Sequence, residues 1–317
     1  MGQAGNVALG SQTLTITNGS TTFSGVIAGL GGGLTVSGAT QTLAGINTYT
    51  GATKITGGTL ALTGTGSIAT SSGVAIATNG TFDISQTTGG TSITTLSDTG
   101  VGQAGHVTLG SKTLTITNGS TTFSGVIAGL GGGLTISGGT ETLAGINTYT
   151  GATKITGGTL ALTGPGSIAT STGVAIATGG TLDISQTTGG ASITTLADTS
   201  AGQAGNVALG SQTLTITNGS TTFSGVIAGF GGRLTISGGT QTLAGTSNTY
   251  SGATTINSNS TLAGGATNAF SANSAVTLNG NGILDLGSTT QTIAALNSAS
   301  TSAEVTSLSG TGTSQSP

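Results

Sequence analysis

The sequence of 317 residues repeats itself every 100 residues. The segment Gly2–Gly10 (GQAGNVALG) returns almost unchanged at 102–110 and again at 202–210. Near-identity over so many positions is typical of tandem duplication, and arrays in which each unit contacts only its neighbours tolerate changes in copy number. We therefore predict three structural copies, residues 1–100, 101–200 and 201–317, stacked into one continuous solenoid.

The third copy departs from the other two near its middle. Register holds to Gly245, after which Thr246–Tyr250 carries one more residue than Ile146–Tyr149. The sequence diverges from that point and ends in a polar tail after Leu308, for which we expect a partial capping role at one end of the solenoid.

Each copy contains short segments in which apolar and small polar residues alternate with a period of two, as in half-buried strands. These segments include Thr13–Thr17, Leu34–Val36, Thr59–Thr63, Val74–Ile76 and Thr81–Ile84. Equivalent segments lie roughly 20–26 residues apart, which is a spacing typical of solenoid coils. The pattern predicts an all-β parallel solenoid of about four coils per copy and about a dozen in total, or a rod on the order of 60 Å long at about 4.8 Å per coil.

The composition favours a thin core and a neutral surface. Only 3% of the residues are charged, where ordinary soluble domains carry roughly 25%. Aromatic residues make up another 3%, so small aliphatic side chains must fill the interior. Two alternatives stay open: disorder, which Gly- and Ser-rich chains often show, and an antiparallel β-sandwich, which also suits short strands with Asn-Gly turns.

The segment Leu43–Leu60 (LAGINTYTGATKITGGTL) strongly resembles the autotransporter-associated β-strand repeat of bacterial autotransporter passenger regions. It recurs at 143–160, and a third version at 243–257 has Ser258–Ser260 in place of the usual Gly-Gly. The resemblance implies a right-handed parallel β-helix, exported through the outer membrane of a Gram-negative bacterium and displayed on its surface or released. It implies no particular activity.

The sequence contains neither a secretory signal nor the C-terminal translocator barrel that members of this family need. We therefore expect a segment of a longer protein or another export route, with contact to the outer membrane only through a translocator that this chain lacks. The expected location is extracellular or at the outer-membrane surface.

Three residues of the resembling motif have a physical reading of their own. The Asn is expected at a bend, where it tolerates left-handed backbone and its amide bonds to neighbouring backbone or stacks as a ladder. The Tyr is expected to pack inward with its hydroxyl on a partner, and the Gly to permit a turn. The three sets are Asn47, Tyr49, Gly51; Asn147, Tyr149, Gly151; and Asn248, Tyr250, Gly252.

The residues offer little for catalysis or metal binding. His106 is the only histidine, and Asn6 and Asn206 occupy its equivalent positions. The recurrent acids could meet on adjacent coils, but we expect solvated turn residues because calcium needs six to eight oxygen ligands; they are Asp83, Asp183, Asp285, Asp98 and Asp198. The segment 64–69 (GTGSIA) mimics a dinucleotide fingerprint without the helix that should follow. We predict no catalytic, cofactor-binding or metal-binding residues and no enzyme activity.

A formal charge of −3 is too weak to indicate a nucleic-acid partner. The leading functional hypothesis is a structural stalk or adhesin-type passenger segment, whose hydroxyl-rich surface contacts other copies, cell surfaces or glycans. The alternative is a subunit of an extracellular filament, in which open solenoid ends stack head to tail.

Overall fold

The computed structural model describes residues 5–307, and every regular element in them is a β-strand. None of these residues forms a helix that is long and apolar enough to cross a membrane. The chain divides into two compact units: Met1–Lys154 with Gly158–Ala161 and Pro165–Ser171, and Ile155–Gly157 with Leu162–Gly164 and Thr172–Pro317. The polar tail after Leu308 lies outside the described residues.

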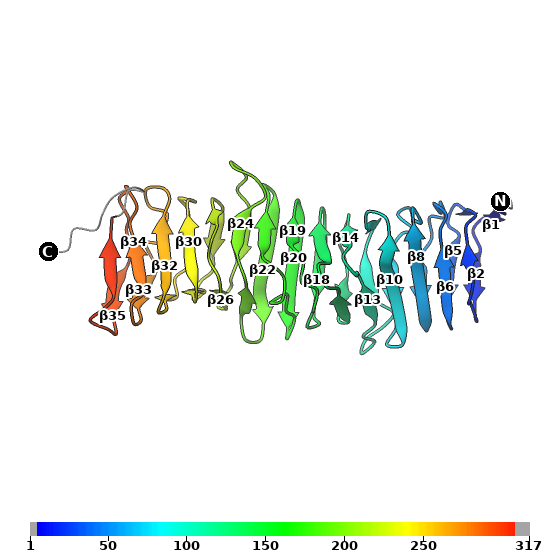
Figure 1. The fold of residues 1–317 in the computed structure, drawn as a ribbon, viewed down its shortest axis with the longest axis horizontal. Helices are drawn as coiled ribbons and strands as arrows, with labels where there is room; N and C mark the ends of the chain where they lie inside the picture. Colours follow the sequence, from blue (N-terminus) through cyan, green and yellow to red (C-terminus); the bar gives the residue numbers. More distant parts are fainter. Residues whose placement is uncertain (1–4, 308–317) are drawn as a thin grey trace. The chain divides into compact units, whose positions relative to one another are not determined.

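In the first unit, successive short strands run around the three sides of each coil, and strands of neighbouring coils lie side by side (Figure 1). One sheet contains β2 (Thr13–Ile16), β5 (Gly33–Val36), β7 (Thr53–Ile55), β9 (Val74–Ile76) and β12 (Leu96–Asp98). The second contains β3 (Thr22–Phe23), β6 (Thr40–Leu43), β8 (Gly58–Gly64), β10 (Gly80–Thr87), β13 (His106–Thr108) and β16 (Val126–Ala128). Further strands are β1 (Val7–Ala8) paired with β4 (Ile27–Ala28), the series β11 (Thr91–Ile93), β14 (Thr113–Ile116) and β17 (Gly133–Ile136), and β15 (Thr122–Phe123) paired with β18 (Thr140–Leu143).

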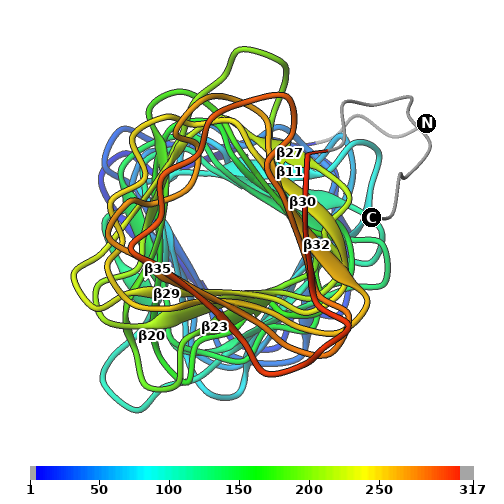
Figure 2. The same ribbon diagram turned by 90° about the vertical axis from the view of Figure 1, so that its left-hand side faces the viewer.

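The second unit repeats this arrangement. Its ladders are β21 (Val174–Ile176) with β24 (Leu196–Asp198); β22 (Gly180–Thr187), β25 (Asn206–Ala208) and β28 (Val226–Ala228); β23 (Ala191–Ile193), β26 (Thr213–Ile216), β29 (Arg233–Ile236), β31 (Thr254–Ile256), β33 (Ala275–Leu278) and β35 (Ala295–Ser298); and β27 (Thr222–Phe223), β30 (Gly239–Leu243), β32 (Ser260–Gly264), β34 (Ile283–Asp285) and β36 (Glu304–Thr306). Seen end-on, β27, β30 and β32 lie along one wall of this unit and β23, β29 and β35 along another (Figure 2). The remaining strands, β19 (Thr153–Ile155) and β20 (Gly158–Gly164), carry residues of both units.

The ladders within both units are parallel, so the chain is an all-β solenoid as predicted and the antiparallel sandwich is wrong. The alternative of a disordered chain is also wrong for residues 5–307, which form paired strands throughout. Alternation drives the fold: Leu34 and Val36 are completely buried, whereas Thr35 between them is partly exposed. Paired residues of neighbouring coils point the same way, so inward side chains stack in columns. One such column consists of Leu34, Thr53, Val74 and Leu96. Such columns make a dry interior from aliphatic residues alone.

The two units together contain about 14 turns, slightly more than the dozen predicted. The first coils are short, since Thr13 pairs with Gly33 and Leu34 with Thr53, which are steps of 20 and 19 residues. Longer coils follow, as in the step of 25 residues between Thr81 of β10 and its partner His106 of β13.

A copy is not a whole number of turns in the first unit. Four steps, β2 to β5, β7, β9 and β12, make four turns on one side, and the chain then passes β13 on the second side before reaching β14 on the third. β14 is the sequence equivalent of β2 in the second copy. One repeat of 100 residues therefore makes four full turns and then covers two more of the three sides, which is four and two-thirds turns. A copy is therefore close to the predicted four or so coils, and equivalent strands of copies one and two lie on different sides of the first unit.

Candidate functional site

The motif asparagine is buried and uses its amide to join three coils. The Oδ1 atom of Asn47 accepts a hydrogen bond from Ile27 N at 3.0 Å, one coil earlier. Its Nδ2 atom donates to Gly45 O and to Ser67 O, each at 3.0 Å, and Ser67 lies one coil later. Its backbone does not have the positive φ that the sequence suggested; among the described non-glycine residues only Ala39, Asn259 and Asn268 do. The asparagine therefore bonds backbone on both neighbours and forms no ladder with another motif asparagine.

The motif tyrosine begins a chain of buried hydroxyl groups. Tyr49 is 1% exposed, and its hydroxyl lies 2.7 Å from Oγ1 of Thr53, which lies 2.9 Å from Oγ of Ser71. Ser71 in turn donates to Gly51 O at 2.9 Å. Burial raises the pKa of Tyr49 to about 12, partly offset by its hydrogen bond with Thr53. The phenol is therefore neutral at physiological pH and belongs to a buried chain of hydrogen-bonded hydroxyl groups.

The motif glycine is required by the approach of the preceding coil and not by a left-handed turn. A Cβ atom on Gly51 would lie 2.6 Å from both Gly31 O and Gly32 O. The Gly51 N–H group donates to Gly32 O at 2.8 Å, so this close contact is part of the stacking. Glycine here allows two backbones to meet without a side chain between them.

The second and third copies repeat the same contacts. The amide oxygens of Asn147 and Asn248 accept from Ile127 N at 2.9 Å and Ile227 N at 2.6 Å. The tyrosine–threonine distances are 2.7 Å for Tyr149 with Thr153 and 2.8 Å for Tyr250 with Thr254. Cβ atoms on Gly151 and Gly252 would meet carbonyl oxygens of the preceding coil at 2.5 Å each. The departure from the family pattern at 258–260 therefore leaves these bonds intact.

A buried acid occupies a position where the other copies have an amide. Gln241 is completely buried, and its Nε2 atom donates to Leu196 O, Thr221 O and Thr242 O at 3.0, 3.0 and 3.1 Å. Glu141 takes this position in the second copy, is also completely buried, and has a carboxyl oxygen without a hydrogen-bond partner. Desolvation raises the pKa of Glu141 to about 9, so it is protonated at neutral pH. Sequence reasoning missed this residue, although it shares the inward parity of Leu143 two residues later.

The other titratable candidates do not converge. His106 is exposed at the start of β13. Asp83 on β10 and Asp98 on β12 lie in different sheets, so they do not meet as the sequence suggested they could. Asp83 accepts from Ser85 N at 2.8 Å, and Asp98 accepts from Ser124 N of the next coil at 3.0 Å. Within residues 5–307, no three His, Cys, Asp or Glu side chains are grouped so that they could hold a metal ion.

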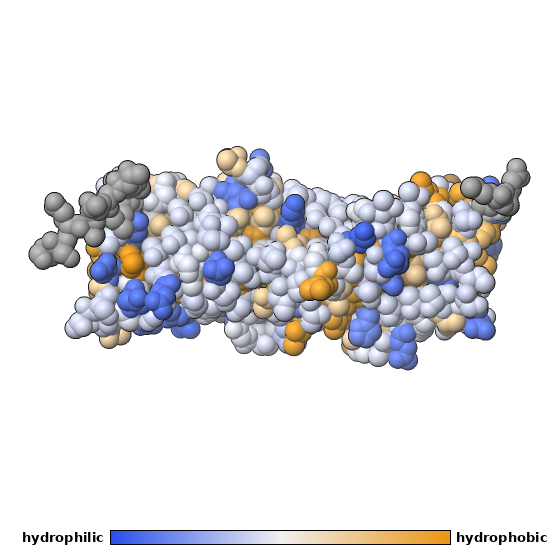
Figure 3. Space-filling model, viewed as in Figure 1, coloured by the Kyte–Doolittle hydropathy of each residue, from blue (hydrophilic) through white to orange (hydrophobic). Residues whose placement is uncertain are grey.

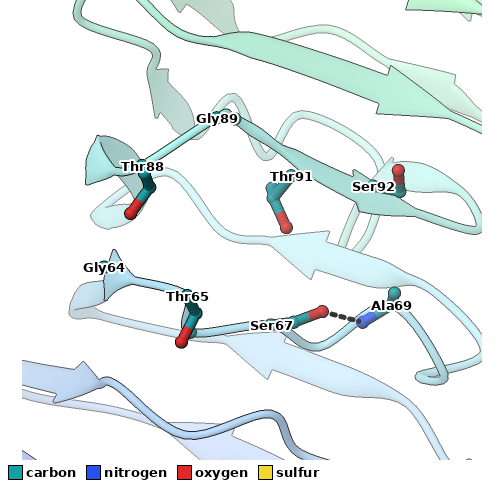
Figure 4. Close-up of a pocket in the computed structure, with 10 residues that line it drawn as sticks. Gly64, Thr65, Ser67, Ala69, Thr88, Gly89, Thr91 and Ser92 are labelled. Atoms are coloured by element: carbon teal, nitrogen blue, oxygen red, sulfur yellow. Dashed lines mark hydrogen bonds between the residues drawn. The ribbon is translucent and has the colours of Figure 1, made fainter.

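A shallow pocket of about 310 Å³ lies between two neighbouring turns of the first unit. One rim is the segment 64–69 and the other is 88–92, with Thr and Ser hydroxyls on both (Figure 4). Within this pocket Ser67 Oγ accepts from Ala69 N at 3.2 Å. The lining has no charged side chain, and among the described residues no helix follows the segment 64–69, so the helix N-terminus at which a dinucleotide fingerprint binds phosphate is missing.

The described surface is mostly polar without charge, and the face in Figure 3 is largely of intermediate hydropathy. Isolated apolar side chains protrude from it at equivalent turn positions: Leu30 and Leu130 are each 85% exposed, and Phe230 is 94% exposed. Scattered exposed hydrophobic residues are normal for folded proteins and define no patch.

Comparison with known families gives the same result as the motif. The passenger-associated-transport-repeat family model matches residues 34–62, 138–162 and 236–258, and each match contains one motif Asn, Tyr and Gly. These three matches confirm the resemblance to the autotransporter passenger repeat. Neither the curated proteins nor the solved structures yield a significant match.

Proposed function

We propose that this chain is a structural segment of an autotransporter-like passenger, displayed at the outer-membrane surface or released, which spaces an adhesive element from the cell. The observation that supports this proposal most directly is that the motif asparagine makes the same hydrogen bond to the preceding coil in all three copies. In each case the amide oxygen accepts a hydrogen bond from a backbone N–H group of the preceding coil; the residues are Asn47, Asn147 and Asn248. Every copy therefore contains the contacts that stack its own coils. A scaffold of this kind changes length by gaining or losing copies and has no need of reactive side chains.

Two further features support a structural role over catalysis. The recurrent acids Asp83 and Asp98 cap backbone N–H groups, and the motif phenols are buried. The outer surface offers neutral hydroxyl groups, which suit weak, repeated contacts with other copies, cell surfaces or glycans. We propose such contacts as its partners and propose no cofactor.

Removing residues 101–200 tests the spacer role. The deletion joins equivalent positions of two copies, so the shortened chain should keep its strand content by circular dichroism. Its maximum dimension in solution scattering should fall by about 22 Å, which is four and two-thirds turns at about 4.8 Å each. On cells, an epitope placed before the segment should move closer to the surface while adhesion by other parts of the protein persists. Collapse of the shortened chain, or loss of adhesion with an unchanged epitope distance, would exclude a modular spacer.

A second candidate is a subunit of a self-assembling extracellular filament. The observation in its favour is the parallel register of the coils, in which each strand pairs with the equivalent strand of the next coil. Parallel edges of this kind can add a strand from another chain. Electron microscopy over a range of protein concentrations tests it, since only an assembling chain lengthens as the concentration rises.

A further inference from the structure

In the middle of the first unit, two neighbouring coils separate for a few residues and then rejoin. On one side they are held together by Thr88 N, which donates to Gly64 O at 2.8 Å. On the other side Thr94 Oγ1 donates to Ser71 O at 2.7 Å. Between these contacts β11 is the edge strand of its sheet, since among residues 5–307 it pairs with β14 of the next coil and with no strand of the preceding one. The pocket of about 310 Å³ is the space along that open edge.

The pocket has the size and the free polar groups of a site for a small molecule. Small-molecule sites begin at roughly 300 Å³, so this pocket admits a ligand of about one ring and no folded partner. Thr88 and Thr91 extend their hydroxyl groups from one rim toward the other (Figure 4). Within residues 5–307 neither hydroxyl has a hydrogen-bond partner, so each can both donate to a ligand and accept from it.

The lining narrows the chemical class of the ligand. It consists of Gly, Ala, Ser and Thr residues alone. An ionised ligand would lose hydration without gaining a charged partner in the lining, and an aromatic ligand would find no ring to stack on. A ring that carries several hydroxyl groups offers both donors and acceptors to the threonine hydroxyls and to the backbone around the open edge of β11. These properties together favour a neutral sugar.

The second copy shows that the fold does not require the Thr91 hydroxyl. Ala191 stands at the equivalent position and begins β23. It pairs with Leu214 as Thr91 pairs with Leu114, so the same strand forms in the same register without the hydroxyl group. The hydroxyl of Thr91 is therefore available for a contact outside the chain.

We propose that the pocket between the segments 64–69 and 88–92 binds one ring of a neutral saccharide. The inference rests on the proposed function and deepens it, because it gives the contacts with glycans a site. Thr88 and Thr91 hydrogen-bond the ring hydroxyls from one rim, and the glycine-rich backbone of 64–66 borders the ring on the other. With few hydrogen bonds and no ion pair, the dissociation constant of a single ring is about 1–10 mM.

Titration of the isotope-labelled full chain, followed by nuclear magnetic resonance, tests the site. The neutral probes are methyl α-mannoside, methyl β-glucoside and methyl β-galactoside, and glucuronate is the acidic probe. At least one neutral probe should shift the backbone amide signals of 64–69 and 88–92 in a saturable manner. Thr91→Ala installs the residue of the second copy, so it should keep the unfolding midpoint while weakening binding at least about threefold.

Lys112→Gln is the matched control for a charged ligand. The Lys112 ammonium group donates to Thr88 O at 3.4 Å, and the third copy has Gln212 at the equivalent position. This variant should bind the neutral probe as the wild type does. Binding of glucuronate alone, lost in Lys112→Gln, would overturn the proposal in favour of an acidic ligand.

The proposal also fails if no neutral probe gives a saturable shift up to about 100 mM, or if Thr91→Ala binds as tightly as the wild type. None of these results bears on the spacer role, which the deletion of residues 101–200 tests separately.

Discussion

Thr53 shows how single residues hold this narrow interior together. It stands in an inward column between Leu34 and Val74, where an aliphatic residue would fit, yet its hydroxyl joins Tyr49 to Ser71. Buried hydroxyl groups are costly when left without partners. The inward threonine and the tyrosine are therefore one unit, and the conformation of the coil depends on both.

Replacing this hydroxyl should destabilise the first unit. Thr53→Val keeps the shape of the side chain but leaves the Tyr49 hydroxyl without its partner, at a cost of about 1–3 kcal/mol in the free energy of unfolding. Thr35→Val, in the preceding coil and facing outward, should change it by less than about 0.5 kcal/mol. Urea unfolding midpoints of the two variants provide the measurement, and equal midpoints would show that the hydroxyl chain contributes nothing.

Glu141 makes stability depend on pH. Its pKa rises from 4.5 in the unfolded chain to about 9 in the folded protein because burial disfavours the carboxylate. The folded state therefore keeps a proton that the unfolded chain loses above about pH 4.5, so this contribution is complete below that pH and is lost as the pH rises towards 9.

Glu141→Gln should restore the amide donor that Gln241 provides and raise the free energy of unfolding by about 1–3 kcal/mol at neutral pH. The variant should also lose the decline in urea midpoint between pH 5 and 9. Gln241→Glu is the matched converse and should introduce such a decline in the second unit. If both variants keep the wild-type pH profile, the carboxyl group is not buried as described.

At the scale of strands and turns, glycines are not interchangeable. Gly51 meets two carbonyl oxygens of the preceding coil, whereas a Cβ atom on Gly89 would have no neighbour within 4 Å, and Gly89 does not have a positive φ. Gly51→Ala should therefore cost about 1–3 kcal/mol through overpacking. Gly89→Ala should be neutral or stabilising by up to about 1 kcal/mol, because alanine restricts the unfolded chain. Thermal unfolding of the two variants separates them, and a similar loss in both would mean that the coils are not in close contact at Gly51.

The strands with clear alternation were predictable from the sequence. Val74–Ile76 agrees with β9 to the residue, and Thr13–Thr17 and Thr59–Thr63 lie within one residue of β2 and β8 at each end. The short strands β11 and β12 were not predicted, because Thr and Ser dominate residues 91–98 and hide the inward parity of Ile93 and Leu96. The hydrogen bond between Thr53 and Ser71 also needed the structure, since it joins two neighbouring coils and depends on the length of one coil.

At the scale of the whole molecule, the long repeat and the coil do not share a period. The sequence gives 100 residues directly, but the number of turns depends on where coils lengthen, which only the register of the ladders reveals. In the first unit, Leu30 and Leu130 consequently protrude from different sides although they are equivalent in sequence. A partner that recognises one position of the repeat would meet it on successive sides and not along one stripe.

Electron paramagnetic resonance of paired spin labels tests the parallel stacking most directly. Thr15, Thr35 and Lys54 are Cα partners in three successive coils of the first unit and do not point into the core. Labels at Thr15 and Thr35, and at Thr35 and Lys54, should show strong dipolar broadening from backbones about 4.8 Å apart, and labels at Thr15 and Lys54 weaker broadening from about twice that distance. Absence of broadening in the two adjacent pairs, or equal broadening in all three, would contradict coils that stack one upon another in register.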